Sequence, residues 1–177
     1  MRIIAGVNRG RALKAPKWNG LRPTSDKLRE TLFNIIAPRL DGARVLDVFA
    51  GTGAIALEAL SRGAAAATCI EQDRRAVLLI EENRERCGEA DRCVIIRDAV
   101  ERALSTPLTG GPFDIVVLDP PYEYAALERA VRDAATQRAA GALLVLEHAA
   151  RVAPPVPAGL VVTRTVKSGD SALTFYS

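Results

Sequence analysis

The sequence predicts an α/β fold built on a mostly parallel β-sheet, with helices on both faces. From Arg44 onward, short apolar runs typical of strands alternate with stretches of helical periodicity. The strand runs are continuously apolar, which indicates burial on both faces of the sheet. Alternation of this kind produces parallel strands joined by crossover helices. The 177 residues, 49% hydrophobic and 25% charged, suit a folded domain and not a disordered chain.

The part before the sheet, residues 1–40, is expected to hold a basic hairpin and one helix. Residues 2–15 alternate weakly and turn at residues 8–10, which favours a short β-hairpin. After a loop, Thr24 or Ser25 is suited to cap a helix. An apolar stripe at helical spacing follows, and a proline ends it: Leu28, Leu32, Ile35, Ile36 and then Pro38.

The sheet domain is expected to span residues 41–177 and to contain seven strands. Five parallel strands are predicted, at Val45–Phe49, Thr68–Glu71, Val94–Arg97, Ile115–Asp119 and Leu143–Glu147. Four helices are predicted to connect them, at Ala54–Arg62, Arg74–Cys87, Ala99–Leu104 and Ala125–Arg138. An antiparallel hairpin around a Ser-Gly-Asp turn is predicted to complete the sheet, with strands at Leu160–Lys167 and Ala172–Tyr176.

Charge is unevenly spread along the chain. The first 22 residues hold six Lys or Arg and no Asp or Glu, whereas the other residues hold 18 basic and 21 acidic ones. A short cationic segment on an acidic domain is typical of a protein with a phosphate-rich partner. A solvated basic tail explains the same distribution, so this alternative stays open.

Several classes of protein are disfavoured by the sequence. Cys69, Cys87 and Cys93 form no CxxC pair, and His148 is the single histidine. A disulfide framework, a zinc site and a Ser-His triad are therefore not expected. No apolar run approaches the ~18 residues of a membrane span, and the polar start lacks the pattern of a signal peptide. We expect a cytoplasmic protein.

A glycine-rich turn after the first predicted parallel strand favours a nucleoside ligand. Ala50, Gly51 and Gly53 lie in this turn, where glycines let a ligand approach the backbone and the next helix offers free N–H groups. The spacing fits the dinucleotide fingerprint, so by itself it leaves NAD and other nucleosides open. Glu71, 20 residues after Gly51, ends the next strand, where its carboxylate suits both ribose hydroxyls. The alternative is a tight turn with a surface glutamate.

Two aspartates refine the choice of ligand. Asp47 ends the first of these strands, just before the glycines, where it would repel a pyrophosphate. It suits a cationic ligand such as S-adenosylmethionine, which carries a sulfonium and an ammonium group. Asp98, with Ala99 beside it, follows the third strand, where its carboxylate is placed to accept from an adenine amino group. A role for Asp98 as a helix cap or a solvated loop residue is an equal alternative.

The run Asp119-Pro120-Pro121-Tyr122 follows four aliphatic residues of the fourth strand. The prolines fix φ and remove N–H donors, so the turn is rigid at the carboxyl edge of the sheet, where open α/β folds bind ligands. Asp119 and the Pro120 carbonyl offer acceptors, and Tyr122 offers a flat face. We expect this set to hold a planar group by its exocyclic amine while the ring stacks on Tyr122. The alternative is a proline-ended strand with a surface tyrosine.

Asp-Pro-Pro-Tyr in this position is the motif of the amino-methyltransferases, and the chain resembles one branch of them nearly end to end. That branch is the RsmD-type 16S ribosomal RNA guanine N2-methyltransferase family. The matching segments are Arg2–Gly6, Arg9–Arg11, Arg22–Asp26, Arg29–Asn34, Leu46–Gly53, Leu57–Ala64, Asp119–Tyr122 and Glu147-His148. Thr52 stands where many relatives have serine, which is a mild departure.

The resemblance implies a Rossmann-like class I methyltransferase that uses S-adenosylmethionine and no metal. It implies methylation of a guanine N2 amine, with Asp119, Pro120 and Tyr122 orienting the base. The implied partner of this monomer is 16S ribosomal RNA, alone or within a small-subunit particle. The basic residues expected on RNA phosphates are Arg9, Arg11, Lys14, Lys17 and Arg22. The part before the sheet would also cover the cofactor site.

Three other functions remain open. A DNA amino-methyltransferase shares Asp-Pro-Pro-Tyr, but it normally carries a target-recognition region, and none is visible. A non-catalytic RNA-binding assembly protein with this fold would not need Asp47, Glu71 and Asp119. A nicotinamide oxidoreductase has no use for Asp47 or for the Asp-Pro-Pro-Tyr run, and titration with both cofactors separates it.

Overall fold

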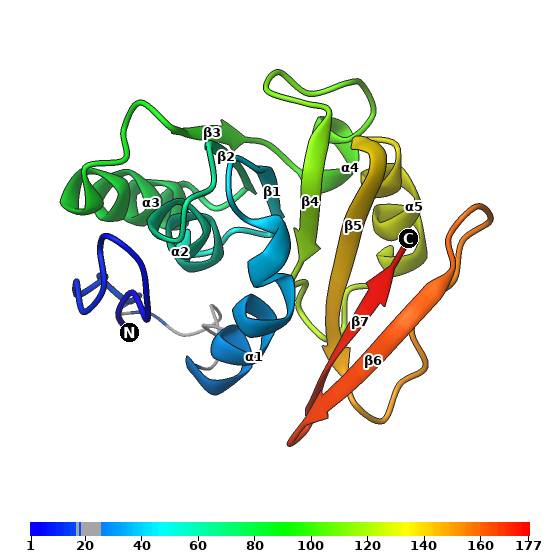
Figure 1. The fold of residues 1–177 in the computed structure, drawn as a ribbon. Helices are drawn as coiled ribbons and strands as arrows, with labels where there is room; N and C mark the ends of the chain where they lie inside the picture. Colours follow the sequence, from blue (N-terminus) through cyan, green and yellow to red (C-terminus); the bar gives the residue numbers. More distant parts are fainter. Residues whose placement is uncertain (17, 19–25) are drawn as a thin grey trace.

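The computed structural model describes residues 1–16, 18 and 26–177, and within them the centre is a seven-stranded sheet (Figure 1). The strand order is β3-β2-β1-β4-β5-β7-β6. The strands are β1 (Arg44–Val48), β2 (Ala66–Glu71), β3 (Cys93–Arg97), β4 (Phe113–Leu118), β5 (Arg138–Ala149), β6 (Val162–Ser168) and β7 (Ser171–Tyr176). Strands β1 to β5 pair in parallel, and β7 pairs antiparallel with β5 and β6. The predicted α/β class, with a mostly parallel sheet and an antiparallel hairpin, is confirmed.

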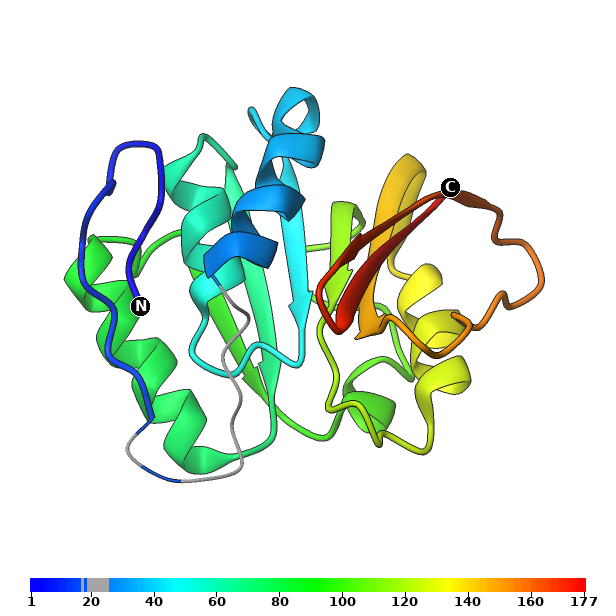
Figure 2. The same ribbon diagram turned by 90° about the horizontal axis from the view of Figure 1, so that it is seen from below.

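Helices cover both faces of this sheet (Figure 2). They are α1 (Asp26–Ile36), α2 (Ala54–Ser61), α3 (Arg74–Cys87), α4 (Val100–Ala103) and α5 (Leu127–Ala135), with a 3₁₀ turn at Ala37–Arg39. Side chains of α1, α2 and α3 share one buried cluster with Val45 of β1, whereas α4 and α5 share a second cluster with Leu46. Adjacent residues of β1 therefore face opposite helical layers, as its unbroken apolar run predicts. No helix of the described ranges is long and apolar enough to cross a membrane.

Some predicted elements have different bounds. The first strand of the sheet stops at Val48, because Phe49 adopts a left-handed backbone with a φ of 72° that a strand does not continue through. The helix predicted over residues 125–138 is the shorter α5, and β5 begins where that helix was expected to end. The predicted caps Thr24 and Ser25 lie outside the described residues.

Residues 1–16, which we call the arm, pack against α2 and α3 (Figures 1 and 2). Their two halves pair in the antiparallel sense around the predicted turn, since the N–H groups of Ile3, Gly10 and Leu13 donate to the carbonyls of Arg11, Ile3 and Met1. Within the described chain this pairing includes one isolated bridge, between Arg2 and Ala12, so it is less regular than the hairpin predicted over residues 2–15. The arm also bonds to the domain, because the buried carboxylate of Glu58 on α2 accepts from the N–H groups of Ile4 at 2.7 Å and Ala5 at 2.9 Å.

Gly6 marks the closest approach between the arm and α2. It has a φ of +83°, and the next residue, Val7, donates its N–H to the Ser61 carbonyl at 2.8 Å. A Cβ on Gly6 would lie 1.8 Å from that same carbonyl oxygen. Only glycine fits here, because the obstacle is helix backbone and not a flexible side chain.

Gly6→Ala is therefore expected to destabilise the docked arm by ~2–5 kcal/mol, the sum of a left-handed backbone cost of ~1–2 kcal/mol and an overpacking cost of ~1–3 kcal/mol. Gly10→Ala is the matched control, because Gly10 has a φ of +81° and nothing within 4 Å of the new Cβ. It should cost only the backbone component. Urea unfolding of both variants measures the difference, and equal losses would contradict the close approach.

Candidate active site

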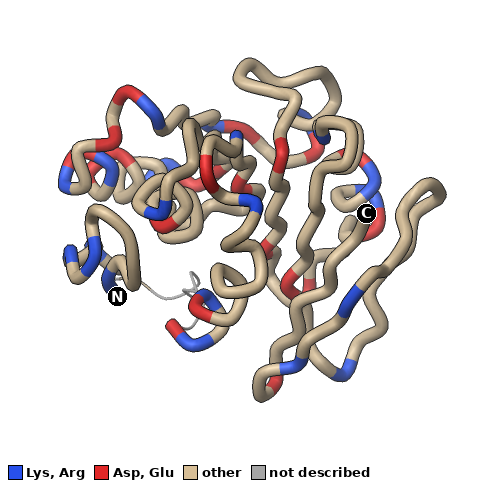
Figure 3. The backbone as a smooth tube through the Cα atoms, in the orientation of Figure 1, with Lys and Arg blue, Asp and Glu red and all other residues tan. Residues whose placement is uncertain are grey.

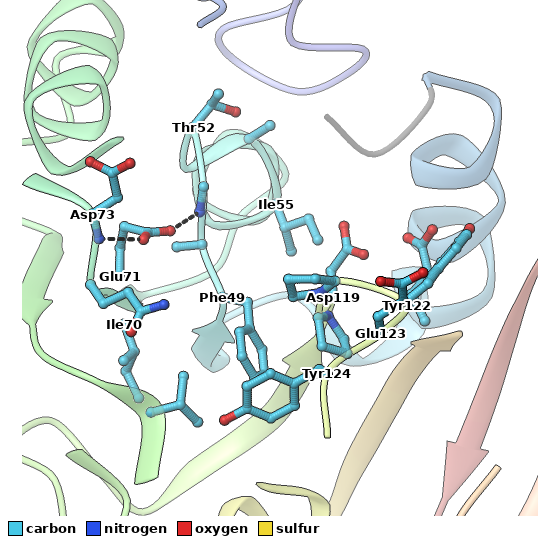
Figure 4. Close-up of a pocket in the computed structure, with 18 of the residues that line it drawn as sticks. Phe49, Thr52, Ile55, Ile70, Glu71, Asp73, Asp119, Tyr122, Glu123 and Tyr124 are labelled. Atoms are coloured by element: carbon cyan, nitrogen blue, oxygen red, sulfur yellow. Dashed lines mark hydrogen bonds between the residues drawn. The ribbon is translucent and has the colours of Figure 1, made fainter. Parts of the chain in front are cut away.

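A cavity of about 650 Å³ opens at the carboxyl edge of the sheet, between the ends of β1 and β4 (Figure 4). The strand order reverses between these two strands, and open α/β sheets bind ligands at such a point. The volume lies in the range of small-molecule sites. The cavity is lined by Trp18, Phe49, Ala50, Gly51, Thr52, Ala54, Ile55, Ile70, Glu71, Gln72, Asp73, Arg75, Val100, Glu101, Asp119, Pro120, Pro121, Tyr122, Glu123, Tyr124, Glu147 and Ser171.

The turn between β1 and α2 forms one wall and contains an unusual run of left-handed backbone. Phe49, Gly51 and Gly53 have φ values of 72°, 56° and 74°. Ala50 and Gly51 line the cavity, but Gly53 does not. A Cβ on Gly53 would lie 3.0 Å from the Cγ2 atom of Ile80 on α3. The first glycine thus serves the cavity side of the turn, and the second allows the turn to pack against α3.

Glu71, at the end of β2, is held beside this turn (Figure 4). Its Oε2 accepts from the N–H of Gly51 at 2.9 Å, and its Oε1 accepts from the N–H of Asp73 at 2.8 Å. A carboxylate has about four acceptor positions, so these two bonds leave capacity for two hydroxyl donors. The side chain is therefore preorganised as an acceptor on the cavity wall.

Asp47, which the sequence predicts to face a cationic ligand, is not among the residues that line the cavity. Its side chain is 1% exposed and lies beneath the turn, where Oδ2 accepts from the N–H of Ala56 at 3.2 Å. Its Oδ1 has no hydrogen-bond partner among the described residues. Burial raises the pKa of Asp47 to about 7, an effect that the Ala56 N–H opposes and the charges of Asp119 and Glu71 reinforce. Asp47 braces the start of α2 under the turn.

The titration of Asp47 is expected to make the protein less stable as the pH rises. Its folded pKa of about 7 lies above the ordinary value of 3.8, so the folded state binds the proton more tightly than the unfolded chain. The resulting stability is complete below about pH 4 and is lost as the pH rises through about 7. Asp47→Asn should remove this part of the pH dependence. Urea unfolding at about pH 5 and about pH 8 measures the change in the free energy of unfolding between the two pH values. The same change in wild type and in Asp47→Asn would contradict the role of Asp47 in this pH dependence.

Asp98 and Ala99 are not among the residues that line the cavity. The guanidinium of Arg102 pairs with the Asp98 carboxylate, and the Ala99 N–H donates to it at 2.7 Å. These donors, Arg102 first, hold the pKa of Asp98 below its usual range. Asp98 does not cap α4, whose N-cap is Ala99 without a side-chain cap bond, and its contact with an adenine amino group stays a prediction. The cavity wall here consists of Val100 and Glu101.

An aromatic corner that sequence reasoning missed closes the bottom of the cavity in Figure 4. The rings of Phe49 and Tyr124 meet edge to face, with centroids 4.9 Å apart and planes at 77°. The Tyr124 hydroxyl donates to Glu101, which lowers the pKa of that carboxyl, while burial raises the pKa of Tyr124. Their positions in the sequence could have indicated this corner, because both aromatic residues lie next to predicted site segments. Phe49 directly precedes Ala50 and Gly51 of the glycine turn, and Tyr124 follows the Asp-Pro-Pro-Tyr run by two residues.

The structure brings Asp119, Pro120 and Tyr122 together on the β4 side of the cavity. The loop starts beside the end of β1, where the Asp119 N–H donates to the Val48 carbonyl at 3.4 Å. Tyr122 is 40% exposed, and its hydroxyl shares a 2.5 Å hydrogen bond with the Oγ of Ser171 on β7. The ring is thus held at its hydroxyl end and remains accessible. Ser171 and Glu147 join the cavity because β7 and β5 pair beside the loop, a contact that needs the sheet order.

Trp18 lines the cavity and stacks on Arg75 of α3, whose guanidinium carbon lies 4.9 Å from the ring centroid. Arg75 is in turn paired with Asp73 at 2.7 Å. The sequence alone is compatible with stacking of Trp18 on a base and with its packing onto the domain. The structure shows a cation–π contact at the cavity wall.

The predicted RNA-binding cations Arg9, Arg11 and Lys14 are exposed. Figure 3 shows the arm, with its basic positions, next to α3, which carries both acidic and basic positions. Arg11 donates to the Arg86 carbonyl, and Lys14 pairs with Glu82. Lys17 and Arg22 lie outside the described residues. Arg11 and Lys14 therefore already have intramolecular partners that a phosphate would have to replace.

Two groups that the sequence left unassigned stay away from the cavity. His148 is buried on β5, its Nε2 lies 2.8 Å from the Thr174 hydroxyl, and burial lowers its pKa. Cys69 and Cys93 lie side by side in the core, with sulfurs 4.0 Å apart. Over the ranges that the structure describes, no three His, Cys, Asp or Glu side chains gather in a metal-binding arrangement.

Comparisons with known proteins agree over the whole chain. A family model described as conserved hypothetical protein 95 matches residues 1–177. The chain is 37% identical over 179 residues to ribosomal RNA small subunit methyltransferase D of Escherichia coli strain K12, covering 99% of this chain and 89% of that protein. A solved structure of the Escherichia coli protein yhhF is 38% identical, with a TM-score of 0.87, and covers 99% of this chain and 96% of that chain.

A more distant solved structure shares the fold. It is an RNA methyltransferase from Salinibacter ruber in complex with S-adenosyl-L-homocysteine, with a TM-score of 0.66 and 18% identity. The match covers 87% of this chain and 92% of that chain. The Rossmann-like methyltransferase architecture is therefore retained at low identity.

Proposed function

The chain belongs to the RsmD-type family of ribosomal RNA methyltransferases, and from this membership we propose that it methylates the N2 amine of a guanine in 16S ribosomal RNA. The methyl donor in this proposal is S-adenosylmethionine. One observation carries it: the ribose-type acceptor Glu71 and the amine-type acceptor Asp119 line the same cavity at the reversal of strand order. Such a cavity suits a nucleoside cofactor and a nucleobase side by side.

The residues present fit the proposed cofactor. Glu71 has acceptor capacity for the two ribose hydroxyls, and Ile70 and Val100 supply apolar walls for a purine. The backbone of Ala50 and Gly51 lets a ligand approach the turn closely. Asp47 supports this turn from beneath, since its Oδ2 accepts from the Ala56 N–H. When bound, S-adenosylmethionine supplies a methyl group activated by a sulfonium.

The Asp-Pro-Pro-Tyr loop supplies what the target amine lacks. Guanine N2 is a weak nucleophile because its lone pair is delocalised into the ring. We assign Asp119 and the Pro120 carbonyl as acceptors that orient the amine protons and stabilise the positive charge that develops on nitrogen. The Tyr122 ring stacks on the base, and its hydroxyl is anchored by Ser171. Positioning of this kind is a large part of catalysis. The base has to leave any stack to enter the cavity.

The arm and α1 complete the proposal as the part that contacts RNA and covers the cofactor site. Arg9 forms no ion pair in the described part of the chain, and Arg11 and Lys14 would exchange their partners on α3 for phosphates. Trp18 already reaches the cavity wall from this part of the chain. We propose a monomer that acts in the cytoplasm, where its substrate is made.

Glu71→Ala is expected to weaken binding of S-adenosylhomocysteine by ~1–3 kcal/mol, because partners of a charged acceptor lose their hydrogen bonds. Glu71→Gln is the conservative control, since one oxygen can still accept from Gly51 or Asp73. It should retain more affinity than the alanine variant. Isothermal calorimetry gives both values, and unchanged affinity in Glu71→Ala would remove Glu71 from the cofactor site.

The function itself is tested by mapping methylated nucleotides in 16S ribosomal RNA by mass spectrometry. A strain with the gene deleted should lack one N2-methylguanine, and a plasmid copy should restore it. The Asp119→Ala variant serves as the control that keeps the protein present. Methylated RNA in the deletion strain would exclude the proposal, and rescue of ribosome assembly by the inactive variant would favour the assembly-protein alternative. A methyl mark that appears only in DNA would favour the DNA enzyme.

A further inference from the structure

Asn83 on α3 links the arm to the glycine turn through one buried side chain. It is 0% exposed. Its Oδ1 accepts from the Lys14 N–H at 2.7 Å. Its Nδ2 donates to the Lys14 carbonyl at 3.1 Å and to the Thr52 carbonyl at 3.0 Å. A single amide thus binds both backbone groups of one arm residue and one backbone group of the cavity wall.

The orientation of this amide follows from the chemistry of its partners. An N–H group only donates, so it requires the amide oxygen, and the two carbonyls only accept, so they require the amide nitrogen. All three bonds are satisfied in one orientation, and a flipped amide would break all three. The side chain is therefore fixed only while the arm and the turn are both in place.

The glycine turn lies between the arm and the cavity. Thr52 lines the cavity, while its carbonyl is held from behind by Asn83. Its hydroxyl also lies 3.6 Å from the sulfur of Met1, at the start of the arm. A ligand that orders the cavity side of this turn therefore acts on a segment whose other side rests on the arm.

We infer that Asn83 is a positioning residue that couples occupancy of the cofactor cavity to docking of the arm. If Lys14 leaves α3, the buried Oδ1 of Asn83 loses the Lys14 N–H as its donor, and the amide is released to turn away from Thr52. Leaving such a group unpaired is unfavourable, so arm docking and the ordered turn support each other. By thermodynamic linkage, a ligand that stabilises the turn must also stabilise the docked arm, and by the same factor. The inference rests on the proposed function in one respect, that the cavity binds S-adenosylmethionine and its product.

The linkage gives the arm a role beyond its charge. Lys14 offers its ammonium at the surface, where it pairs with Glu82, while its backbone is held by Asn83. A phosphate bound by that ammonium would therefore affect the glycine turn through two steps, from the Lys14 backbone to Asn83 and from Asn83 to the Thr52 carbonyl. The enzyme would bind RNA more tightly when the methyl donor is present.

The test measures amide hydrogen exchange of Lys14 by NMR, with and without saturating S-adenosylhomocysteine and without any RNA. In wild type, the ligand should slow exchange of this amide by about fivefold or more, the lower end of ordinary coupling between sites. In Asn83→Ala, a helix-compatible change that leaves room for water, the ligand should change the exchange rate less than twofold. Asn83→Leu fills the same space without polar atoms and should behave likewise, which guards against misfolding of one variant.

Ser61→Ala is the matched control. Ser61 also anchors the arm, since its Oγ accepts from the Asn8 N–H at 3.0 Å and donates to the Ala5 carbonyl at 2.6 Å. Both of these bonds join α2 to the arm, and neither involves the glycine turn. In this variant the Lys14 amide should exchange faster than in wild type, both with and without ligand. The ratio of its exchange rates in the free and the ligand-bound protein should stay at the wild-type value. A purely structural role for Asn83 predicts the same preserved ratio in the Asn83 variants.

The outcomes separate the inference from the function on which it rests. If calorimetry shows that wild type does not bind S-adenosylhomocysteine, the proposed function fails and the coupling fails with it. If the ligand binds and Lys14 exchange stays constant, only the coupling is wrong. If both Asn83 variants keep the wild-type ratio of Lys14 exchange rates without and with ligand, the coupling between the cavity and the arm does not depend on Asn83.

Discussion

Asp119→Ala is expected to lower the turnover of methyl transfer by about 10²–10³-fold, while affinity for S-adenosylhomocysteine stays nearly unchanged. The reason is that Asp119 lies on the β4 side of the cavity, where the target amine is proposed to bind. The groups proposed to hold the cofactor, Glu71 and the glycine turn, lie at the ends of β1 and β2. Removing a preorganised acceptor therefore affects the transition state far more than it affects the bound cofactor.

Asp119→Asn is the informative companion, since it keeps the size and one acceptor oxygen but loses the charge. Its rate should fall between wild type and the alanine variant. Single-turnover assays with labelled S-adenosylmethionine, on both naked 16S ribosomal RNA and small-subunit particles, measure all three. A wild-type rate for Asp119→Ala on the better substrate would show that the acceptor mechanism is wrong.

Tyr122→Ala is expected to be the second severe change, because stacking of an aromatic side chain on a base contributes ~1–3 kcal/mol, or about 5- to 150-fold. Tyr122→Phe should be mild, because the ring survives. The structure adds a matched control, Ser171→Ala, which removes the partner of the Tyr122 hydroxyl at 2.5 Å and leaves the ring intact. If anchoring of the ring matters, Tyr122→Phe and Ser171→Ala should show the same small loss.

The same single-turnover assay ranks these variants. The expected order of rates is wild type, then Tyr122→Phe and Ser171→Ala together, then Tyr122→Ala, with Asp119→Ala lowest. A Tyr122→Phe rate as low as that of Tyr122→Ala would show that the hydroxyl acts directly on the substrate. In that case the stacking explanation would have to be abandoned.

The sheet was predictable because its strands carry their own signal. Runs such as the one from Ile115 to Leu118 are apolar at every position, and they are buried against helices on both sides. The docking of the arm on α2 was not predictable from the same patterns. Backbone groups of the arm bond to the side chains of Glu58 and Ser61, which are more than 50 positions away in the sequence. A weak alternation reports local preference and carries no information about such distant partners.

The candidate site shows the same division between local and distant information. The positions of Glu71 and Asp119 at the ends of their strands correctly predicted that both lie at one edge of the sheet, because parallel strands end together. Such positions did not reveal which way a side chain turns. Asp47 bonds to the Ala56 N–H at the start of α2, and Asp98 pairs with Arg102. Ser171 and Glu147 line the cavity because β5 pairs with β7, and the sequence patterns did not predict that pairing.

The order in which the parts of the molecule can form follows from the docking of the arm. Asn8 bonds to Glu89, 81 positions later, and Lys14 bonds to Asn83, 69 positions later. Contacts this distant form late, because a long segment must first be ordered to meet them. During synthesis the arm is made before its docking surface exists, and it has to wait for α2 and α3. Since Trp18 follows the arm and forms part of the cavity wall, completion of the cavity is a late event in the life of each new chain.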